Sequence, residues 1–300
     1  MKLFLKKLGV LCIGFLALAS ILSFGSLWAL RQSSFYKPSF LANEIKETRF
    51  DYIILGASNG LTTLNTKLID SMLPIRGLNL SMDDTSISSQ FLMLQHFLAE
   101  GKLTKYCVLA SNPSSLDFKR NTINDNDYRF LMYNNRDYVS DYYKQFSSRR
   151  AHILYYSKWM PALGMSYYNA ELFYPSLNSL IKPKRRNRFD DKGNYTYPVF
   201  HSQDEEITNF EDMPIQFSNR FVSKIKKLCE DNNIKFICYI PPMKAKKAQI
   251  NSSKYKVINH SNALTNTKYF YDVIHVNSLG RKASSINFAN TFSTYIKNNL

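Results

Sequence analysis

The sequence has little cysteine, and the few cysteines it has are scattered. Its 300 residues include four, with no C-x-x-C pair and no Cys/His cluster, which excludes a zinc finger and a disulfide scaffold. Cys107 and Cys238 lie in apolar, strand-like runs, where a thiol usually acts as a small hydrophobic side chain. No structural metal or disulfide framework is therefore expected.

Acidic residues are also scarce relative to basic ones. The chain has 23 Asp and Glu against 39 Lys and Arg, a formal net charge of +16. So basic a protein can bind nucleic acid, anionic lipid or an acidic glycan, and the charge alone does not choose among them. The composition is otherwise globular, with 45% hydrophobic and 21% charged residues, which excludes a disordered or collagen-like chain.

The longest apolar run lies at the N-terminus. Residues 8–30 contain no charged side chain, and at about 1.5 Å per residue they are long enough for a hydrocarbon core of about 30 Å. Lys2, Lys6 and Lys7 precede the run and only Arg31 follows it closely. The excess of positive charge keeps the N-terminus in the cytoplasm and places the rest outside. Residues 1–31 are thus predicted to be a cytoplasmic tip and a transmembrane signal-anchor.

A cleaved signal peptide is the alternative for the same segment. Ala17-Leu18-Ala19 has the small-x-small form of a cleavage site, but the apolar run continues for another eleven residues, which favours an uncleaved anchor. In both cases the main domain lies outside the cytoplasm, and the uncleaved anchor keeps it at the cell membrane. Nucleic acid is therefore excluded as the expected partner.

Beyond a linker at 32–49, residues 50–300 alternate apolar runs with helical patterns, which is typical of an α/β domain with a mainly parallel sheet. Helical spacing of apolar residues predicts helices around 87–98, 217–228 and 279–296. Residues 119–214 break the pattern and are predicted to be an insertion with helices of its own, either a lid or a local mini-core. The predicted strands are Tyr52–Leu55, Gly77–Leu80, Tyr106–Ala110, Lys235–Ile240 and Tyr269–Tyr271.

Polar residues follow the predicted strands, where ligands gather in a doubly wound sheet. A serine is a weak nucleophile until an imidazole takes its proton, and a carboxylate fixes the tautomer of that imidazole. Ser58, His275 and Asp272 can fill these three roles, and Asn112 can donate to the oxyanion of the tetrahedral intermediate. No metal or organic cofactor is required.

These residues resemble the conserved blocks of the SGNH/GDSL hydrolase superfamily. The segment from Asp272 to Arg281 is similar to that family's D-x-x-H-x-N-x-x-G ending, and Gly56-Ala57-Ser58 resembles its first block. Asn112 stands in the third block, without the usual leading Gly and following Asp. The second block is the least similar: Asp83 is assigned to its oxyanion position, with Ser81 as the alternative. Three asparagines near these blocks are weaker candidates for substrate contact: Asn59, Asn79 and Asn277.

The resemblance implies a flavodoxin-like, three-layer α/β/α sandwich with a five-stranded sheet. The membrane anchor makes the layout similar to membrane-tethered bacterial members, which include D-alanyl transfer proteins and alginate O-acetyltransferases. Such relatives imply esterase or O-acyltransferase chemistry on acylated glycans or related envelope polymers. Whether water or a sugar hydroxyl accepts the acyl group is left open, as is a degenerate scaffold that serves as an accessory protein in polysaccharide or teichoic-acid assembly.

Each residue also has an ordinary structural interpretation. Ser58 can be a helix N-cap, since strand–Gly–x–Ser–helix is common capping sequence. His275 with Asp272 can be a structural pair at a helix start, and Asn112 before Pro113 can be a turn residue. The basic run Lys182–Arg188 is either a solvated loop or a contact with anionic groups on a glycan or membrane surface.

Overall fold

The computed structural model of the chain describes residues 1–119, 122–200, 204–251 and 254–297. It divides into two compact units, each made of two separate segments. Unit 1 comprises Met1–Lys46 and Asp125–Asn187, and unit 2 comprises Glu47–Asn124 and Arg188–Leu300. The segment predicted as an insertion at 119–214 is thus shared between the units, because its last part, 188–214, belongs to unit 2.

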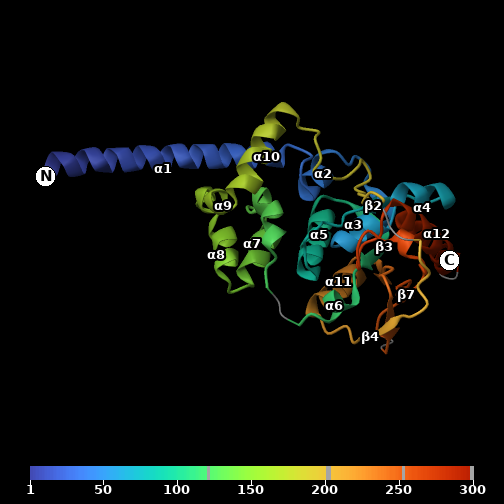
Figure 1. The fold of residues 1–300 in the computed structure, drawn as a ribbon. Helices are drawn as coiled ribbons and strands as arrows, with labels where there is room; N and C mark the ends of the chain where they lie inside the picture. The colour runs from blue at the N-terminus through green and yellow to red at the C-terminus, as the bar shows by residue number, and fades with distance from the viewer. Residues whose placement is uncertain (120–121, 201–203, 252–253, 298–300) are drawn as a thin grey trace. The chain divides into compact units, whose positions relative to one another are not determined.

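Unit 1 is helical, and in Figure 1 it is formed by the blue N-terminal helices and the green-to-yellow helices of the chain's middle. The end of α1 packs against α9, α10 and η1. Residues 32–49, predicted as a linker, instead contain α2, which buries Phe40 and Leu41. The elements of unit 1 are α1 (Lys2–Arg31), α2 (Lys37–Asn43), η1 (Asp125–Tyr133), α7 (Asp137–Lys144), α8 (Arg149–Tyr156), α9 (Pro161–Tyr167) and α10 (Asn169–Ile181).

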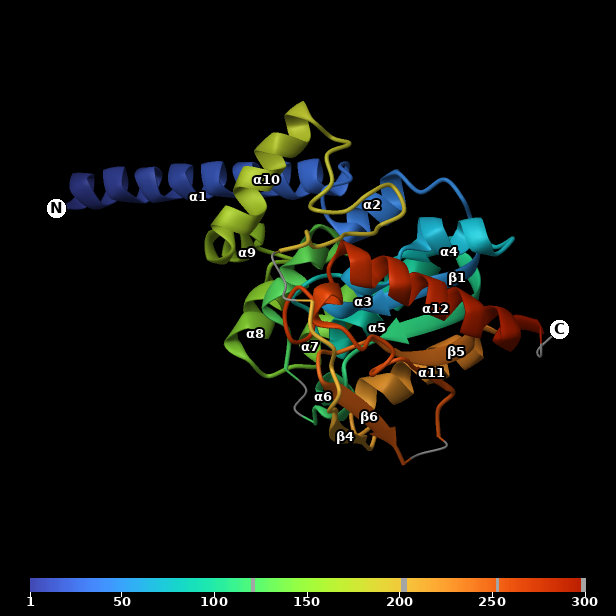
Figure 2. The ribbon, with the colours of Figure 1, turned by 45° about the vertical axis from the view of Figure 1, so that its right-hand side comes forward.

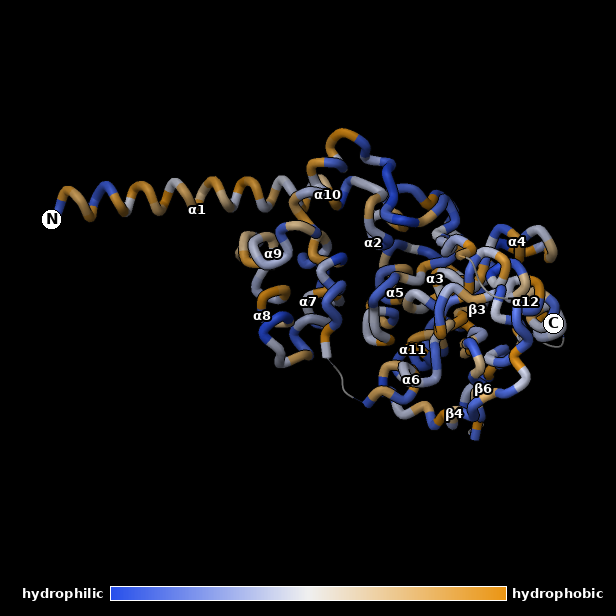
Figure 3. Tube along the Cα trace, viewed as in Figure 1, coloured by the Kyte–Doolittle hydropathy of each residue, from blue (hydrophilic) through white to orange (hydrophobic). Residues whose placement is uncertain are grey.

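The helix α1 is the one described helix that is long and apolar enough to cross a membrane, although an N-terminal signal sequence meets the same criterion. Figure 3 shows its hydrophobic colouring along most of its length. Its buried residues all lie near its C-terminal end: Ser23, Ser26, Ala29 and Leu30.

Unit 2 is an α/β unit with a five-stranded parallel sheet in the order β2-β1-β3-β5-β7. A separate pair of parallel strands, β4 and β6, was not predicted. The strands are β1 (Arg49–Gly56), β2 (Gly77–Asn79), β3 (Leu103–Ala110), β4 (Glu211–Ile215), β5 (Lys235–Ile240), β6 (Lys246–Ile250) and β7 (Val257–Asn259). The helices are α3 (Ser58–Thr63), α4 (Thr66–Met72), α5 (Ile87–Ala99), α6 (Pro113–Asp117), α11 (Arg220–Asp231), η2 (Thr267–Tyr269) and α12 (Ser278–Lys297).

The core of unit 2 follows from the alternation of side chains along its strands. Tyr52 and Ile54 of β1 point to the face that is covered by Phe288 and Phe292 of α12, which Figure 2 shows lying along the sheet. The helices α5 and α11 pack against β1 and β5 and against each other. The three helices predicted from apolar spacing are therefore present, and α5 begins after the N-cap Ser86, which forms a capping box with Ser89.

The fifth strand is not the one that the sequence suggested. The aromatic run Tyr269–Tyr271 was predicted as a strand, but it overlaps the 3-10 helix η2, whose first turn is capped by the side chain of Asn266. The fifth strand is β7, a run of three residues flanked by Lys256 and His260, so that no apolar run marks it in the sequence. The other four predicted strands agree with β1, β2, β3 and β5.

Candidate active site

The serine lies at the point where the central strand β1 turns into helix α3. Gly56 ends β1, and a Cβ atom there would lie 2.2 Å from the carbonyl oxygen of Ala110, so only glycine fits between the two strands. The Gly56 N–H donates to Oε1 of the buried Gln90 at 3.1 Å. The next residue but one, Ser58, is therefore held at the carboxyl edge of the sheet.

The side chain of Ser58 does not cap α3. The N-cap residue of that helix is Ala57, and no side chain caps it. Instead, Ser58 Oγ lies 2.7 Å from Nε2 of His275. This contact joins segments 217 residues apart in the sequence, and it disagrees with the capping interpretation of Ser58.

The histidine is oriented by the aspartate three residues before it. Asp272 Oδ2 lies 2.7 Å from Nδ1 of His275, while Oδ1 accepts the N–H groups of Ile274 (2.8 Å) and His275 (2.7 Å). A proton on Nδ1 donates to the carboxylate and leaves Nε2 as an acceptor facing Ser58. The three side chains thus form one hydrogen-bonded chain in which the serine can lose its proton to the imidazole.

The electrostatics favour a charged aspartate. Burial raises the pKa of Asp272, but the hydrogen bonds from the His275 ring and from the two backbone N–H groups outweigh it, so that the pKa lies below its usual value. The side chain of His275 is 13% exposed and that of Asp272 is 43% exposed. The carboxylate is therefore available as an anion to stabilise an imidazolium on His275.

Two asparagines connect the start of helix α3, where Ser58 lies, to the segment that follows β3. Asn112 caps α6, because its Oδ1 accepts the Ser115 N–H at 2.9 Å, and this fixes its amide nitrogen, which lies 3.4 Å from Oδ1 of Asn59. Asn59, next to Ser58, donates in turn to the carbonyl oxygen of Ile274 at 2.5 Å. Asn112 is thus linked through Asn59 to Ile274, the residue before His275. Asn59, 3% exposed, ties the serine loop to the histidine loop.

Residues 79–83, the second block, are hydrogen-bonded to Gly60 of α3 and to Gly56 at the end of β1. Asn79 is fully buried; its amide donates to the Gly60 carbonyl at 3.1 Å and its Oδ1 accepts the Ser81 N–H at 3.0 Å. The Met82 N–H donates to the Gly56 carbonyl at 2.9 Å. The backbone N–H groups of residues 81 and 82 are therefore engaged within the protein. Asp83 is partly buried and lies near enough to Tyr197 to affect its pKa.

Asn79 and Asn277 were predicted as weak substrate contacts, and their burial argues for a different role. Asn277 is fully buried, caps the start of α12 through Leu279 and Gly280, and donates to the Lys268 carbonyl at 2.7 Å. Both amides hold loops that carry candidate catalytic residues. A buried amide with its groups engaged in this way stabilises the loop and has no free surface for a substrate.

Three aromatic side chains beside the histidine, which we call the aromatic wall, were not predicted: Tyr197, Phe200 and Tyr271. The rings of Tyr197 and Tyr271 stack at 4.2 Å with an interplanar angle of 12°, and the Tyr197 ring lies 5.3 Å from that of His275. Phe200, 56% exposed, lies 5.1 Å from Tyr271. Burial, neighbouring tyrosine and the carboxylates of Asp272 and Asp83 raise the pKa of Tyr197.

The Tyr197 backbone reaches the site through a bridge to Asn277. Tyr197 belongs to the stretch that was predicted as an insertion, and nothing in its spacing places it near residue 275. Only the long-range pairing of two irregular segments reveals the aromatic wall.

Comparison with models of protein families finds no match for this chain, and neither does comparison with curated proteins. Among the described residues, no three His, Cys, Asp or Glu side chains gather in a way that could hold a metal ion.

Proposed function

We propose that this protein is a membrane-anchored serine esterase or O-acyltransferase that acts on acyl esters of an envelope polysaccharide. The observation that carries the proposal is the relay in which Ser58 Oγ lies 2.7 Å from His275 Nε2 and His275 Nδ1 lies 2.7 Å from Asp272. A helix cap at Ser58 would require neither contact, and a structural pair of Asp272 and His275 would require only the second. A serine, an imidazole and a carboxylate in line is the arrangement that activates a hydroxyl.

In the first half of the reaction, Ser58 Oγ attacks the ester carbonyl while its proton moves to His275 Nε2. Asp272 stabilises the imidazolium that forms, because its carboxylate accepts a hydrogen bond from the N–H at Nδ1 of His275. The tetrahedral intermediate collapses when His275 returns the proton to the leaving sugar oxygen. The products of this half-reaction are an acyl group on Ser58 and a free sugar hydroxyl.

The oxyanion of the intermediate needs donors that are already oriented. The Asn112 amide is fixed by its role as the cap of α6, and the first N–H groups of a helix, here those of α3, have no partner within the helix. The N–H groups of residues 81 and 82 are occupied. We therefore assign the oxyanion to the Asn112 amide and the Ser58 N–H, with Asp83 at the rim of the site.

In the second half, an oxygen nucleophile gives its proton to His275 Nε2 and attacks the acyl carbon. The bond from that carbon to Ser58 Oγ then breaks as His275 returns the proton to Oγ, which restores the free serine. Water as the nucleophile gives hydrolysis, and a sugar hydroxyl gives acyl transfer. The 43% exposure of the Asp272 side chain indicates an open site, which suits a polymer chain that enters from the side. Both outcomes use the same three residues and require no cofactor.

The aromatic wall supports a glycan as the substrate. Stacked tyrosine rings present flat apolar surface with polar edges, a surface on which the C–H face of a sugar ring packs. Val273 and Ile274, 54% and 39% exposed, lie in the same loop as His275. The net charge of +16 further favours an anionic polymer.

The location follows from α1. Lys2, Lys6 and Lys7 at its start favour a cytoplasmic N-terminus, which leaves unit 2 outside the cytoplasm. The fold that we propose for unit 2 is the three-layer α/β/α sandwich of SGNH hydrolases, with α12 and α4 on one side of the sheet and α5 and α11 on the other. The likeness of residues 272–281 to the ending of that family supports this assignment.

An accessory protein without catalysis is the second candidate, and one observation favours it. The second block offers neither the Ser81 nor the Met82 N–H to an oxyanion. A scaffold in polysaccharide or teichoic-acid assembly would keep the fold and the relay without turnover. Assays of turnover separate the two functions.

The test compares turnover of p-nitrophenyl acetate and of an acetylated glycan by wild type, Ser58→Ala and Ser278→Ala. Ser278 is an exposed serine at the start of α12 and serves as the matched control. We expect Ser58→Ala to lose about 10⁶-fold in kcat, as when a triad serine is removed, and Ser278→Ala to stay active. Absence of wild-type turnover on every acyl ester, with a change only in melting temperature for Ser58→Ala, would favour the accessory function.

A further inference from the structure

Unit 1 exposes large apolar side chains over three of its helices and the turns beside them. Their exposed fractions range from 37% to 78%, and an apolar surface of this extent on a soluble monomer marks a binding surface. These side chains are Tyr156, Trp159, Met160, Leu163, Tyr167, Phe173, Tyr174, Leu177, Leu180 and Ile181.

The arrangement is clearest on α10, whose apolar face points outward. Its exposed large apolar side chains are those of residues 173, 174, 177, 180 and 181, which share one side of a helix with 3.6 residues per turn. Its buried residues lie on the opposite side: Leu172, Pro175, Ser176 and Ser179. A surface helix in water shows the reverse pattern, so the outer face of α10 is suited to an apolar environment.

The inward contact of α10 is of the kind found between helices in membranes. It packs against α1, where three of the four buried residues, Ser23, Ser26 and Ala29, are small and the fourth is Leu30. Small residues let helices approach closely where no hydrophobic effect drives them together. The Ser23 and Ser176 hydroxyls bond to carbonyls of their own helices, at 2.7 and 2.6 Å, which satisfies them without water.

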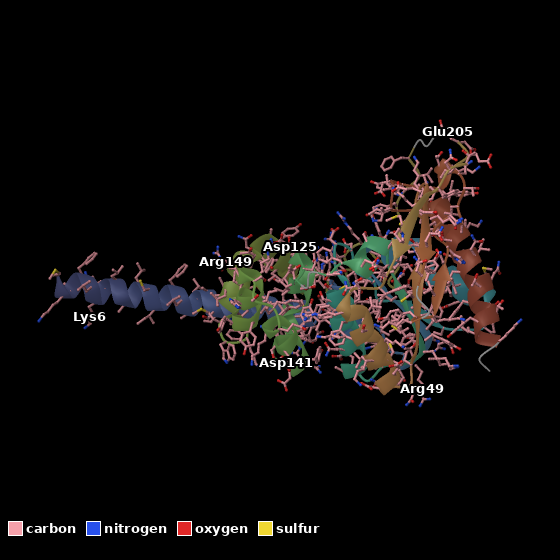
Figure 4. All side chains as sticks on the ribbon, turned by 90° about the horizontal axis from the view of Figure 1, so that it is seen from below. Lys6, Arg49, Asp125, Asp141, Arg149 and Glu205 are labelled. Atoms are coloured by element: carbon pink, nitrogen blue, oxygen red, sulfur yellow. The ribbon has the colours of Figure 1, made fainter. Side chains whose placement is uncertain are left out.

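The position of this contact along α1 fixes its depth. The apolar run at 8–30 is about 35 Å long at 1.5 Å per residue, slightly more than a hydrocarbon core of about 30 Å. The buried residues of α1 all lie in its last third, at 23–30. In Figure 4, Lys6 lies far along α1 from Arg149, Asp125 and Asp141 of the same unit. If α1 spans the membrane, α10 lies at the outer boundary of the bilayer.

Basic residues stand where the apolar face of α10 ends. Lys182, Lys184 and Arg185 follow the helix and are exposed, whereas Arg186 pairs with Glu44. Lys158 lies 5.8 Å from the ring of the exposed Trp159. Exposed aromatic rings beside lysine and arginine are typical of the interface between lipid headgroups and acyl chains.

We propose that unit 1 rests on the outer surface of an anionic phospholipid bilayer. The outer face of α10 and the Trp159 side chain lie at the headgroup boundary, while Lys182, Lys184 and Arg185 bind lipid phosphates. This inference rests on α1 spanning the membrane and is independent of the catalysis. It assigns to the inserted segment a role in lipid binding.

The test uses the two tryptophans of the sequence, both in unit 1. Full-length protein is reconstituted into phosphatidylglycerol-containing vesicles with lipids brominated at shallow or deep positions. In Trp28→Phe, Trp159 is the one emitter left, and in Trp159→Phe it is Trp28. We expect shallow bromines to quench Trp159 more than deep ones, and quenching to fall when phosphatidylglycerol is replaced by phosphatidylcholine.

The two emitters separate failure of the inference from failure of the anchor. Quenching of Trp28 without quenching of Trp159 would leave α1 in the membrane and overturn the proposal for unit 1. Absence of quenching for both would contradict the anchor and the proposal together. The triple variant Lys182→Gln, Lys184→Gln, Arg185→Gln should abolish the dependence on anionic lipid, and persistence of that dependence would contradict the assignment of these residues.

Discussion

Both units of this chain bury large apolar side chains, but only α10 of unit 1 turns a whole apolar face outward among the described helices beyond α1. In unit 2, Tyr52, Phe288 and Phe292 are buried between α12 and the sheet, and the polar residues gather at the strand ends. In unit 1, Leu177, Leu180 and Ile181 face outward. The apolar side chains of unit 2 named here are thus shielded from solvent, whereas those of α10 are exposed to it. The catalytic proposal concerns the first and the membrane proposal the second.

After the loss of the nucleophile in Ser58→Ala, the largest expected effect is on the aspartate of unit 2. Asp272→Asn should lower kcat by about 10⁴-fold, because an amide neither stabilises the imidazolium nor enforces the tautomer with a proton on Nδ1. Stopped-flow or steady-state assays of ester turnover measure it. Lipid quenching of Trp159 should not change, and a variant that lost membrane binding as well would break the separation of the two units.

The next effect concerns the oxyanion. Asn112→Ala should lower kcat by about 10²–10³-fold, the usual effect of losing one oxyanion donor. Because Asn112 also caps α6, its loss should reduce stability by about 1 kcal/mol. Asn112→Asp keeps a capping oxygen but has no amide donor, and recovery of turnover by that variant would show that Asn112 only caps.

A matched pair of leucines tests the contrast in burial. Leu109 of β3 is fully buried and Leu180 of α10 is 60% exposed. Leu109→Ala should lower the free energy of unfolding by about 2–5 kcal/mol through the cavity it leaves. Leu180→Ala should change it by less than about 0.5 kcal/mol in detergent. Equilibrium denaturation measures both, and equal losses would mean that the face of α10 is covered within the protein.

The smallest effect concerns substrate choice. Tyr271→Ala removes one ring of the stacked pair at 4.2 Å and should raise KM for an acetylated glycan by about tenfold, equivalent to about 1.4 kcal/mol. KM for p-nitrophenyl acetate should stay within about twofold, since that ester is too small to reach along the wall. Equal changes for both substrates would assign Tyr271 to support of the His275 loop.

The parts of the fold that could be predicted are those with a local signal. Regular apolar spacing predicted α5, α11 and α12, and short apolar runs predicted β1, β2, β3 and β5. The strand β7 has three residues and no such signal, while the aromatic run at 269–271 imitates a strand and instead overlaps a 3-10 turn capped by Asn266. The burial of Ser176 and Ser179 in α10 likewise has no local signal, because it results from the packing of α10 against α1.

In the candidate site, too, some features have a local sequence signal and others depend on contacts between distant segments. Asp272 and His275 are three residues apart before a helix, so their pairing is encoded locally, and the serine follows a strand end. The burial of Asn79 and Asn277, the link from Asn59 to Ile274 and the approach of Tyr197 depend on contacts between distant segments. Residue type alone does not distinguish an asparagine that touches substrate from one that holds a loop.

The central claim is that Ser58 is a nucleophile activated by His275, and an active-site serine probe tests it most directly. A fluorophosphonate forms a stable bond only with a serine oxygen whose proton a neighbouring base removes. We predict that the full-length protein is labelled, that peptide mapping places the adduct on Ser58, and that Ser58→Ala and His275→Ala are not labelled while Ser278→Ala is. Folded wild type that resists the probe, or equal labelling of Ser58→Ala, would contradict the account.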